Sequence, residues 1–135
     1  MLYTTVENII TVMPMVGSAT TVTDSVVALY GNRVEAYINA KISGLYAVPV
    51  SSESGVLMKI TEEITIYELL SKRLGNSRDL SKTEWPSIKK DAEALLNDIA
   101  NGKIALMTSS GTSLMAAGQI SSSTLNYVPT FSPVL

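Results

Sequence analysis

The chain contains no cysteine and no histidine among its 135 residues. The absence of cysteine excludes disulfide bonds, thiolate nucleophiles and cysteine-ligated metals. The absence of histidine removes the usual general base near neutral pH and the commonest ligand for transition metals. The sequence therefore predicts a protein that is not an enzyme, with no catalytic residues, no metal and no cofactor.

Charge is also absent from a long stretch of the chain. Every charged side chain lies between Glu7 and Lys103, so the last 32 residues contain no Asp, Glu, Lys or Arg. Eleven of these 32 residues are Ser or Thr, yet large apolar side chains are scattered among them. A solvated tail normally carries charge and few large apolar residues. We therefore expect an arm that lies against another surface.

The overall charge is low and slightly acidic. The net charge of −2 and the pI near 5.0 leave no global basic field to hold DNA or anionic lipid. The uncharged stretch from Asn8 to Thr23 is interrupted by Pro14 and Gly17, so it does not read as a membrane span. We expect a soluble protein with no membrane partner.

Apolar residues recur every three or four positions along most of the charged part, which is the period of a helix. Thr4 and Glu7 have the spacing of a capping box, and Asp24 and Thr83 are predicted caps further along. Gly31 is predicted to weaken its helix and to mark a kink or break. The expected helices span residues 5–12, 24–43, 56–74 and 84–101.

These helices predict an all-α fold, a compact bundle of about four helices. The predicted helical domain covers residues 1–107, and the predicted extended, uncharged C-terminal arm covers residues 108–135. Short strands are expected near 104–108 and 121–128, where the residues favour extended structure.

Candidate catalytic patterns are weak. Glu62 and Glu63 point about 100° apart on a helix, so they cannot share a site within one chain. Ser109 to Gly111 offers a hydroxyl but no base to activate it. The densest basic run is interleaved with acids, which indicates a mixed-charge surface rather than a nucleic-acid site. Its members are Lys72, Arg73, Arg78, Lys82, Lys89 and Lys90.

Two segments resemble a known family. Residues 37–50, YINAKISGLYAVPV, are similar to the I-D-x-Y-L helix and R-Y-x-x-P-L exit of Mu-like phage head–tail adaptor proteins. Residues 95–104, LLNDIANGKI, resemble the W-L-x-x-I-A-x-G-x-I close of the same family, and residues 64–69 stand at its I-A-x-Y-x-L middle helix. The chain departs from the family at Asn39 and Leu45, where Asp and Arg are usual.

The resemblance implies a structural virion protein of the neck, assembled in the cytoplasm of the bacterial host. Such adaptors form a ring of about twelve subunits between portal and tail, through which the genome passes. The implied partners are other copies of the chain, the portal protein and a tail, tail-terminator or neck protein, with DNA passing through the lumen without specific binding. The alternative is a small helical regulatory or nucleic-acid-binding module.

The arm is expected to extend away from its own body and to be ordered by a neighbouring subunit or by a portal or tail protein. Burial of its apolar side chains in an obligate interface would explain the missing charge. The predicted interface residues are Leu106, Met107, Leu114, Met115, Ile120, Leu125, Tyr127, Val128, Phe131 and Leu135.

Overall fold

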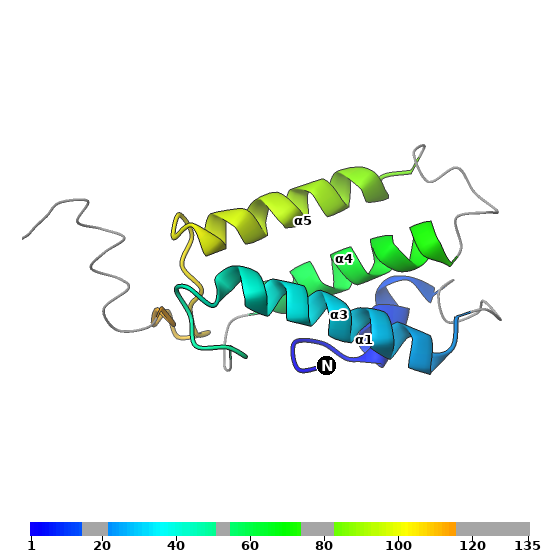
Figure 1. The fold of residues 1–135 in the computed structure, drawn as a ribbon, viewed down its shortest axis with the longest axis horizontal. Coiled ribbons are helices and arrows are strands. Elements are labelled where there is room, and N and C mark those ends of the chain that lie inside the picture. Colours follow the sequence, from blue (N-terminus) through cyan, green and yellow to red (C-terminus); the bar gives the residue numbers. More distant parts are fainter. Residues whose placement is uncertain (15–21, 51–54, 74–82, 116–135) are drawn as a thin grey trace, which may run out of the picture.

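Helices make up most of the part of the chain that the structure describes. The computed structural model describes residues 1–14, 22–50, 55–73 and 83–115. The helices found there are α1 (Val6–Val12), α3 (Asp24–Ile42), α4 (Val56–Lys72) and α5 (Trp85–Ala100) (Figure 1). These bounds lie within about two residues of the predicted ones, which is the usual uncertainty of a helix end. The prediction of an all-α bundle is confirmed.

Threonine side chains fix the starts of the first two helices. Thr5 precedes α1, and its hydroxyl accepts a 3.1 Å hydrogen bond from the Asn8 amide. Thr23 precedes α3 and accepts one of 3.3 Å from the Val26 amide. The prediction that Asp24 caps α3 is therefore wrong by one residue. Asp24 is the first helical residue, where its negative charge is favourable to the positive end of the helix dipole.

The later two helices begin without a side-chain cap. Gly55 precedes α4 with a φ of 107°, a backbone conformation that favours glycine. Glu84 stands at the N-cap of α5, and Pro86 lies in the first turn, where its missing amide hydrogen costs nothing. Thr83 was the predicted cap, but it lies one residue too early and instead accepts a 3.3 Å hydrogen bond from the Trp85 amide.

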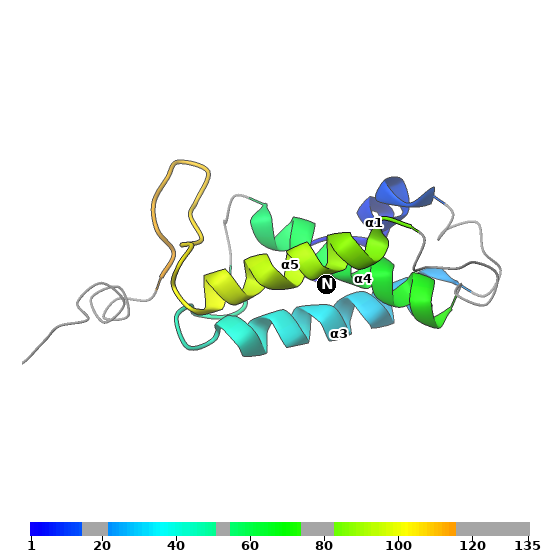
Figure 2. The ribbon, with the colours of Figure 1, turned by 90° about the horizontal axis from the view of Figure 1, so that it is seen from above.

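Two apolar clusters hold the helices together, one toward each end of the bundle. The first joins the C-terminal halves of α3 and α5 to the N-terminal half of α4. Its buried members are Tyr3, Val34, Ile38, Ile42, Tyr46, Val50, Leu57, Ile60, Ile64, Ala92, Leu96, Ile99 and Leu106. The second joins α1 and the N-terminal half of α3 to the C-terminal half of α4. Its buried members are Ile9, Val22, Val27, Tyr30, Ile66, Leu69 and Leu70. Consecutive long helices are thus antiparallel (Figures 1 and 2).

A buried carboxylate fastens the N-terminal segment to α3. Glu35 is only 7% exposed, and its oxygens accept hydrogen bonds from the Leu2 amide at 2.8 and 2.9 Å and from the Tyr3 amide at 2.7 Å. The Tyr3 hydroxyl accepts a 3.0 Å hydrogen bond from the Val50 amide and donates one to Asn39. The network satisfies backbone groups that lie outside the helices.

The same segment explains Gly31, which lies in the middle of α3. A Cβ at this position would stand 2.0 Å from the Met1 sulfur, so the missing side chain lets Met1 lie against the helix. The predicted break does not occur, because α3 is continuous through Gly31. Glycine in a helix costs about 1 kcal/mol relative to alanine, and here the space that the missing side chain leaves is filled by Met1.

After α5 the chain turns back onto its own body. Asn101 is the C-cap of α5, and Gly102 follows it with a φ of 80°, a conformation that ends the helix. Leu106 is 1% exposed and belongs to the first apolar cluster. Its amide donates a buried 2.8 Å hydrogen bond to the Tyr46 hydroxyl. The loop after α3 and the segment after α5 are therefore joined at one end of the bundle.

The start of the predicted arm forms a tight turn. Met107 and Ser113 form a single antiparallel bridge, and the Leu114 amide donates a 2.9 Å hydrogen bond to the Leu106 carbonyl. The strand predicted at 104–108 is reduced to this bridge. Residues 108–115 do not lead away from the body as predicted, because Leu114 and Met115 pack against the first apolar cluster.

Thr65 carries the one buried side-chain polar atom without a hydrogen-bond partner in the described part of the chain. Thr61, one turn earlier on α4, is equally buried, but its hydroxyl donates a 2.7 Å hydrogen bond to the Leu57 carbonyl. Thr65→Val is expected to raise the free energy of unfolding by roughly 1–2 kcal/mol, because it removes an unsatisfied buried hydroxyl. Urea denaturation measures this change. Thr61→Val is the matched control, expected to be neutral or slightly destabilising, and a destabilised Thr65→Val would contradict the prediction.

Candidate interaction surface

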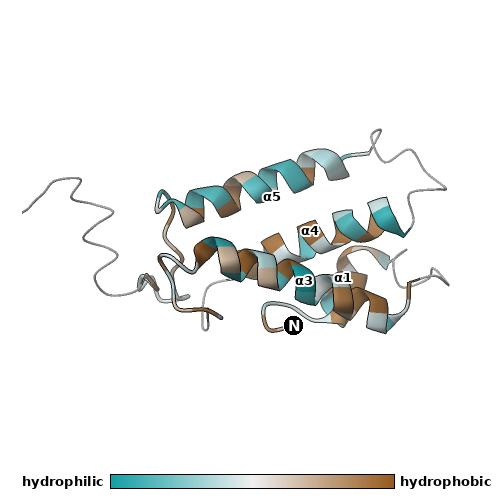
Figure 3. Cartoon of the chain, in the orientation of Figure 1, coloured by the Kyte–Doolittle hydropathy of each residue, from teal (hydrophilic) through white to brown (hydrophobic). Residues whose placement is uncertain are grey.

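The helices α3 and α5 separate toward their N-terminal ends, so that a groove opens above α4. The three buried residues of α5 are Ala92, Leu96 and Ile99, which lie between its middle and its C-terminal end and join the first apolar cluster with α3. In the second cluster α5 contributes only Trp85, which is partly buried. Figure 3 shows α5 with hydrophilic colours along much of its length. No residue of α5 before Ala92 is fully buried, so the start of this helix has little apolar contact to draw it against α3.

This groove has a volume of about 380 Å³, a size that several side chains or a small ligand can fill. Its floor and walls combine apolar, aromatic and charged side chains from three helices. The lining residues are Tyr30, Arg33, Val34, Tyr37, Ile64, Glu68, Lys72, Lys89 and Glu93.

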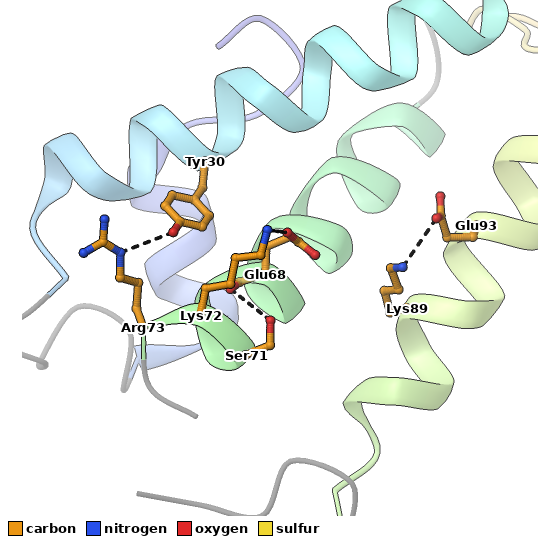
Figure 4. Close-up of polar contacts among 7 residues, drawn as sticks. All are labelled: Tyr30, Glu68, Ser71, Lys72, Arg73, Lys89 and Glu93. Carbon is orange, nitrogen blue, oxygen red and sulfur yellow. Dashed lines mark hydrogen bonds and ion pairs between the residues drawn. The ribbon is translucent and has the colours of Figure 1, made fainter. Parts of the chain in front are cut away.

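Positive charge gathers around Tyr30 at one end of the groove. The guanidinium carbons of Arg33 and Arg73 lie 5.9 and 5.7 Å from the centre of the Tyr30 ring, and Arg73 Nε donates a 3.2 Å hydrogen bond to the Tyr30 hydroxyl. Lys72 stands beside them and forms a 2.8 Å ion pair with Glu68 (Figure 4). We call Arg33, Lys72 and Arg73 the cation cluster.

The wall formed by α5 is closer to electrical neutrality. Glu93 forms a 3.5 Å ion pair with Lys89 and accepts a 2.9 Å hydrogen bond from the Tyr37 hydroxyl. Lys89 also lies 5.5 Å from the centre of the Tyr67 ring. Partial burial and the neighbouring Glu93 carboxylate raise the pKa of Tyr37 above its usual value, so Tyr37 remains a hydrogen-bond donor.

The end of the groove at the cation cluster and the wall formed by α5 thus differ in charge. Glu68 raises the pKa of Lys72 through their hydrogen bond, so the lysine stays charged. Within the described residues, neither Arg33 nor Arg73 has a carboxylate partner. Guanidinium groups form strong, directional hydrogen bonds to carboxylates and phosphates. The cation cluster is therefore suited to binding an anionic group of another molecule.

Two kinds of feature are absent from the described residues. No group of three or more acidic side chains that could hold a metal ion occurs among them. In the same part of the chain, no helix has both the length and the apolar character needed to cross a membrane.

Four of the predicted interface residues lie in the described part of the chain. Leu106 is buried in its own subunit, so its prediction as an interface residue is wrong, because the Tyr46 hydroxyl and the first apolar cluster hold it inside. Met107 is 43% exposed and accessible to a partner. Leu114 and Met115 are half-buried against their own core. The remaining predicted residues lie outside the described residues, namely Ile120, Leu125, Tyr127, Val128, Phe131 and Leu135.

The predicted basic run is divided between two helices. Lys72 and Arg73 lie at the end of α4, and Lys89 lines the opposite wall of the groove. Arg78 and Lys82 lie outside the described residues. The sequence-based prediction missed Arg33, whose signal was its position three residues after Tyr30 on one helix face.

Together, the bundle and its groove define a small all-α protein with a charged groove suited to binding an anionic group. Residues 3–123 match the family described as Bacteriophage Mu, Gp36. The match covers most of the chain, so the chain belongs to this family and is a Mu-like phage protein. No curated protein matches the chain.

Proposed function

We propose that the protein is a head–tail adaptor, a structural component of the virion neck that forms a ring between portal and tail. The observation that carries this proposal is the family match over residues 3–123. It agrees with the resemblance of residues 37–50 and 95–104 to Mu-like adaptors. In the structure, these segments are the end of α3 with its exit loop and the end of α5, which pack together in the first apolar cluster.

The physical features of the chain support a role in assembly rather than catalysis. The segment from residue 104 onward is uncharged and carries apolar side chains, as expected of chain that becomes buried in a permanent interface. The cation cluster supplies a second surface for a partner. In this proposal the partners are other copies of the chain, the portal protein and a tail or neck protein.

The copy number in assembled particles tests the proposal directly. A closed ring requires several copies per particle, and adaptors of this kind are expected to have about twelve. Quantitative mass spectrometry of purified particles, referenced to the portal protein, measures the ratio. A single copy per particle, or absence from particles that are complete, would contradict the proposal.

Weak DNA binding is a second expected result. The net charge is −2, and acidic side chains are interleaved with the basic ones, so phosphate binding that would obstruct genome passage is not expected. Fluorescence anisotropy at physiological salt should give dissociation constants in the non-specific range, roughly 1–100 µM or weaker. Tight, sequence-selective binding would instead support the regulatory alternative.

A further inference from the structure

The cation cluster has a complementary surface on the same chain. Glu84 at the N-cap of α5 is followed at intervals of seven residues by Asp91 and Asp98 within the helix. At 100° per residue they lie within roughly 40° of one another around the helix, and they are spaced roughly 10 Å apart along it. We call these three residues the acid stripe.

The acid stripe is available to a partner. Glu84 and Asp91 are exposed, and Asp98 is half-buried. None of the three forms an ion pair with a described residue. Ile88 and Leu95 are half-buried neighbours of the stripe on the same helix, so they could add apolar contact beside the three carboxylates.

The two surfaces lie on different sides of α5. Glu93 lines the groove, and around the helix it stands roughly 140–180° from the members of the acid stripe. The acid stripe therefore cannot reach the cation cluster of its own subunit. A second copy can present its stripe to that cluster without distorting either subunit.

We propose that the acid stripe of one subunit docks on the cation cluster at the groove of the next, forming a head-to-tail contact. The acid stripe and the cation cluster have opposite charge and are two different surfaces of the chain. A contact between them is therefore heterologous. Heterologous contacts build rings when the rotation between subunits closes. The contact gives a physical basis for the ring of the proposed function. Its place in the virion rests on that proposed function.

Charge also favours a second copy over nucleic acid as the occupant. Glu68 and Glu93 line the same groove as the cations, and these carboxylates would repel a phosphate backbone along its length. The carboxylates of the acid stripe are roughly 10 Å apart, so they can approach the cation cluster without lying close to Glu68 and Glu93. Binding of a DNA fragment that displaces the second copy from the groove would overturn the proposal.

Cysteine crosslinking tests the contact, because the natural chain has no cysteine and the background is therefore low. Ser71 is exposed beside Lys72 near the groove, and Ser87 is exposed between Glu84 and Asp91, so S71C and S87C keep every charge of both surfaces. A short bismaleimide on the concentrated full chain and on assembled particles should link chains that carry both substitutions into dimers, trimers and larger products. S71C alone and S87C alone should give no product, and a mixture of the two single variants should give dimers only.

The control pair is S43C with S87C, because Ser43 is exposed at the far end of α3. This pair should crosslink much less than S71C with S87C. Dimers from S71C alone would show an isologous contact and overturn the proposal. If the chain that carries both S71C and S87C gives no crosslinked product, either as the concentrated full chain or in assembled particles, the proposal is also overturned.

Charge reversal gives a second measurement. R33E with R73E, or E84R with D91R, should each lower the crosslinking yield about tenfold, and all four substitutions in one chain should restore most of it. If particles contain many copies but no crosslink forms, the contact is wrong while the proposed function stands. If the crosslink forms in the purified protein but particles hold a single copy, the proposed function is wrong while the contact stands.

Discussion

Replacing Glu35 with alanine is expected to lower the free energy of unfolding by roughly 2–4 kcal/mol. The Glu35 carboxylate is buried and accepts hydrogen bonds from the amides of Leu2 and Tyr3. Hydrogen bonds to charged groups are stronger than neutral ones, and their loss leaves buried amides without partners. Urea denaturation of the full chain measures the change.

Two controls make this result specific. Glu35→Gln retains one acceptor oxygen, so it should cost about half as much as Glu35→Ala. Glu63→Ala removes a carboxylate whose partner is the exposed Lys59, 3.1 Å away, and surface ion pairs of this kind contribute less than about 1 kcal/mol. Equal effects of Glu35→Ala and Glu63→Ala would show that the buried network does not stabilise the fold.

Glu35→Ala should also release the N-terminal segment. Tyr3 belongs to the first apolar cluster, and its hydroxyl bonds to the Val50 amide, so both contacts depend on the position that Glu35 fixes. Faster hydrogen exchange of the Val50 amide in the variant, with little change at Ile38, would report this local release. Unchanged exchange at Val50 would contradict it.

The helices could be predicted because their signals are local. Ile38 and Ile42 on α3, and Ile60 and Ile64 on α4, recur at helical spacing and are buried in the structure. The signals for the helix ends are also local, although the sequence analysis chose Asp24 as the cap in place of Thr23. Both residues are favourable at a helix start, and only the backbone conformation separates the N-cap from the first turn.

The contacts that join distant segments could not be predicted from the sequence. A glutamate such as Glu35 is normally exposed on a helix, and only the path of residues 1–5 across α3 makes it an acceptor. Likewise, the Tyr46 hydroxyl meets the Leu106 amide because two loops end at the same side of the bundle. The absence of charge after Lys103 was visible in the sequence, but it did not reveal that Leu106 completes its own core.

The groove was partly predictable. Lys72, Arg73 and Lys89 were identified as basic residues of a mixed-charge surface, and two of them, Lys72 and Lys89, form ion pairs in the structure with Glu68 and Glu93. Arg33 joins them only because antiparallel packing of α3 and α4 brings Tyr30 beside the end of α4. Long-range packing, rather than any local pattern, creates the cation cluster.

Removal of the C-terminal residues is expected to separate folding from assembly. Deletion of residues 116–135 leaves every described contact in place, so the free energy of unfolding should change by less than about 0.5 kcal/mol. Deletion of residues 111–135 also removes Leu114 and Met115, which pack against the first apolar cluster, and should cost roughly 1–3 kcal/mol. Thermal and urea unfolding of both truncated chains test this difference.

Both deletions should nevertheless impair assembly, because residues 116–135 carry most of the apolar side chains of the uncharged segment. Complementation of particles that lack the protein should yield few tailed particles with either truncated chain, whereas the full chain restores them. A matched control replaces residues 116–135 with an equally long Gly-Ser segment, which keeps the length but removes the apolar side chains. If this control supports tail attachment, length alone matters and the predicted interface residues carry no binding energy. If the chain lacking residues 116–135 assembles normally, the segment is not an assembly arm, and the missing charge after Lys103 needs another physical reason.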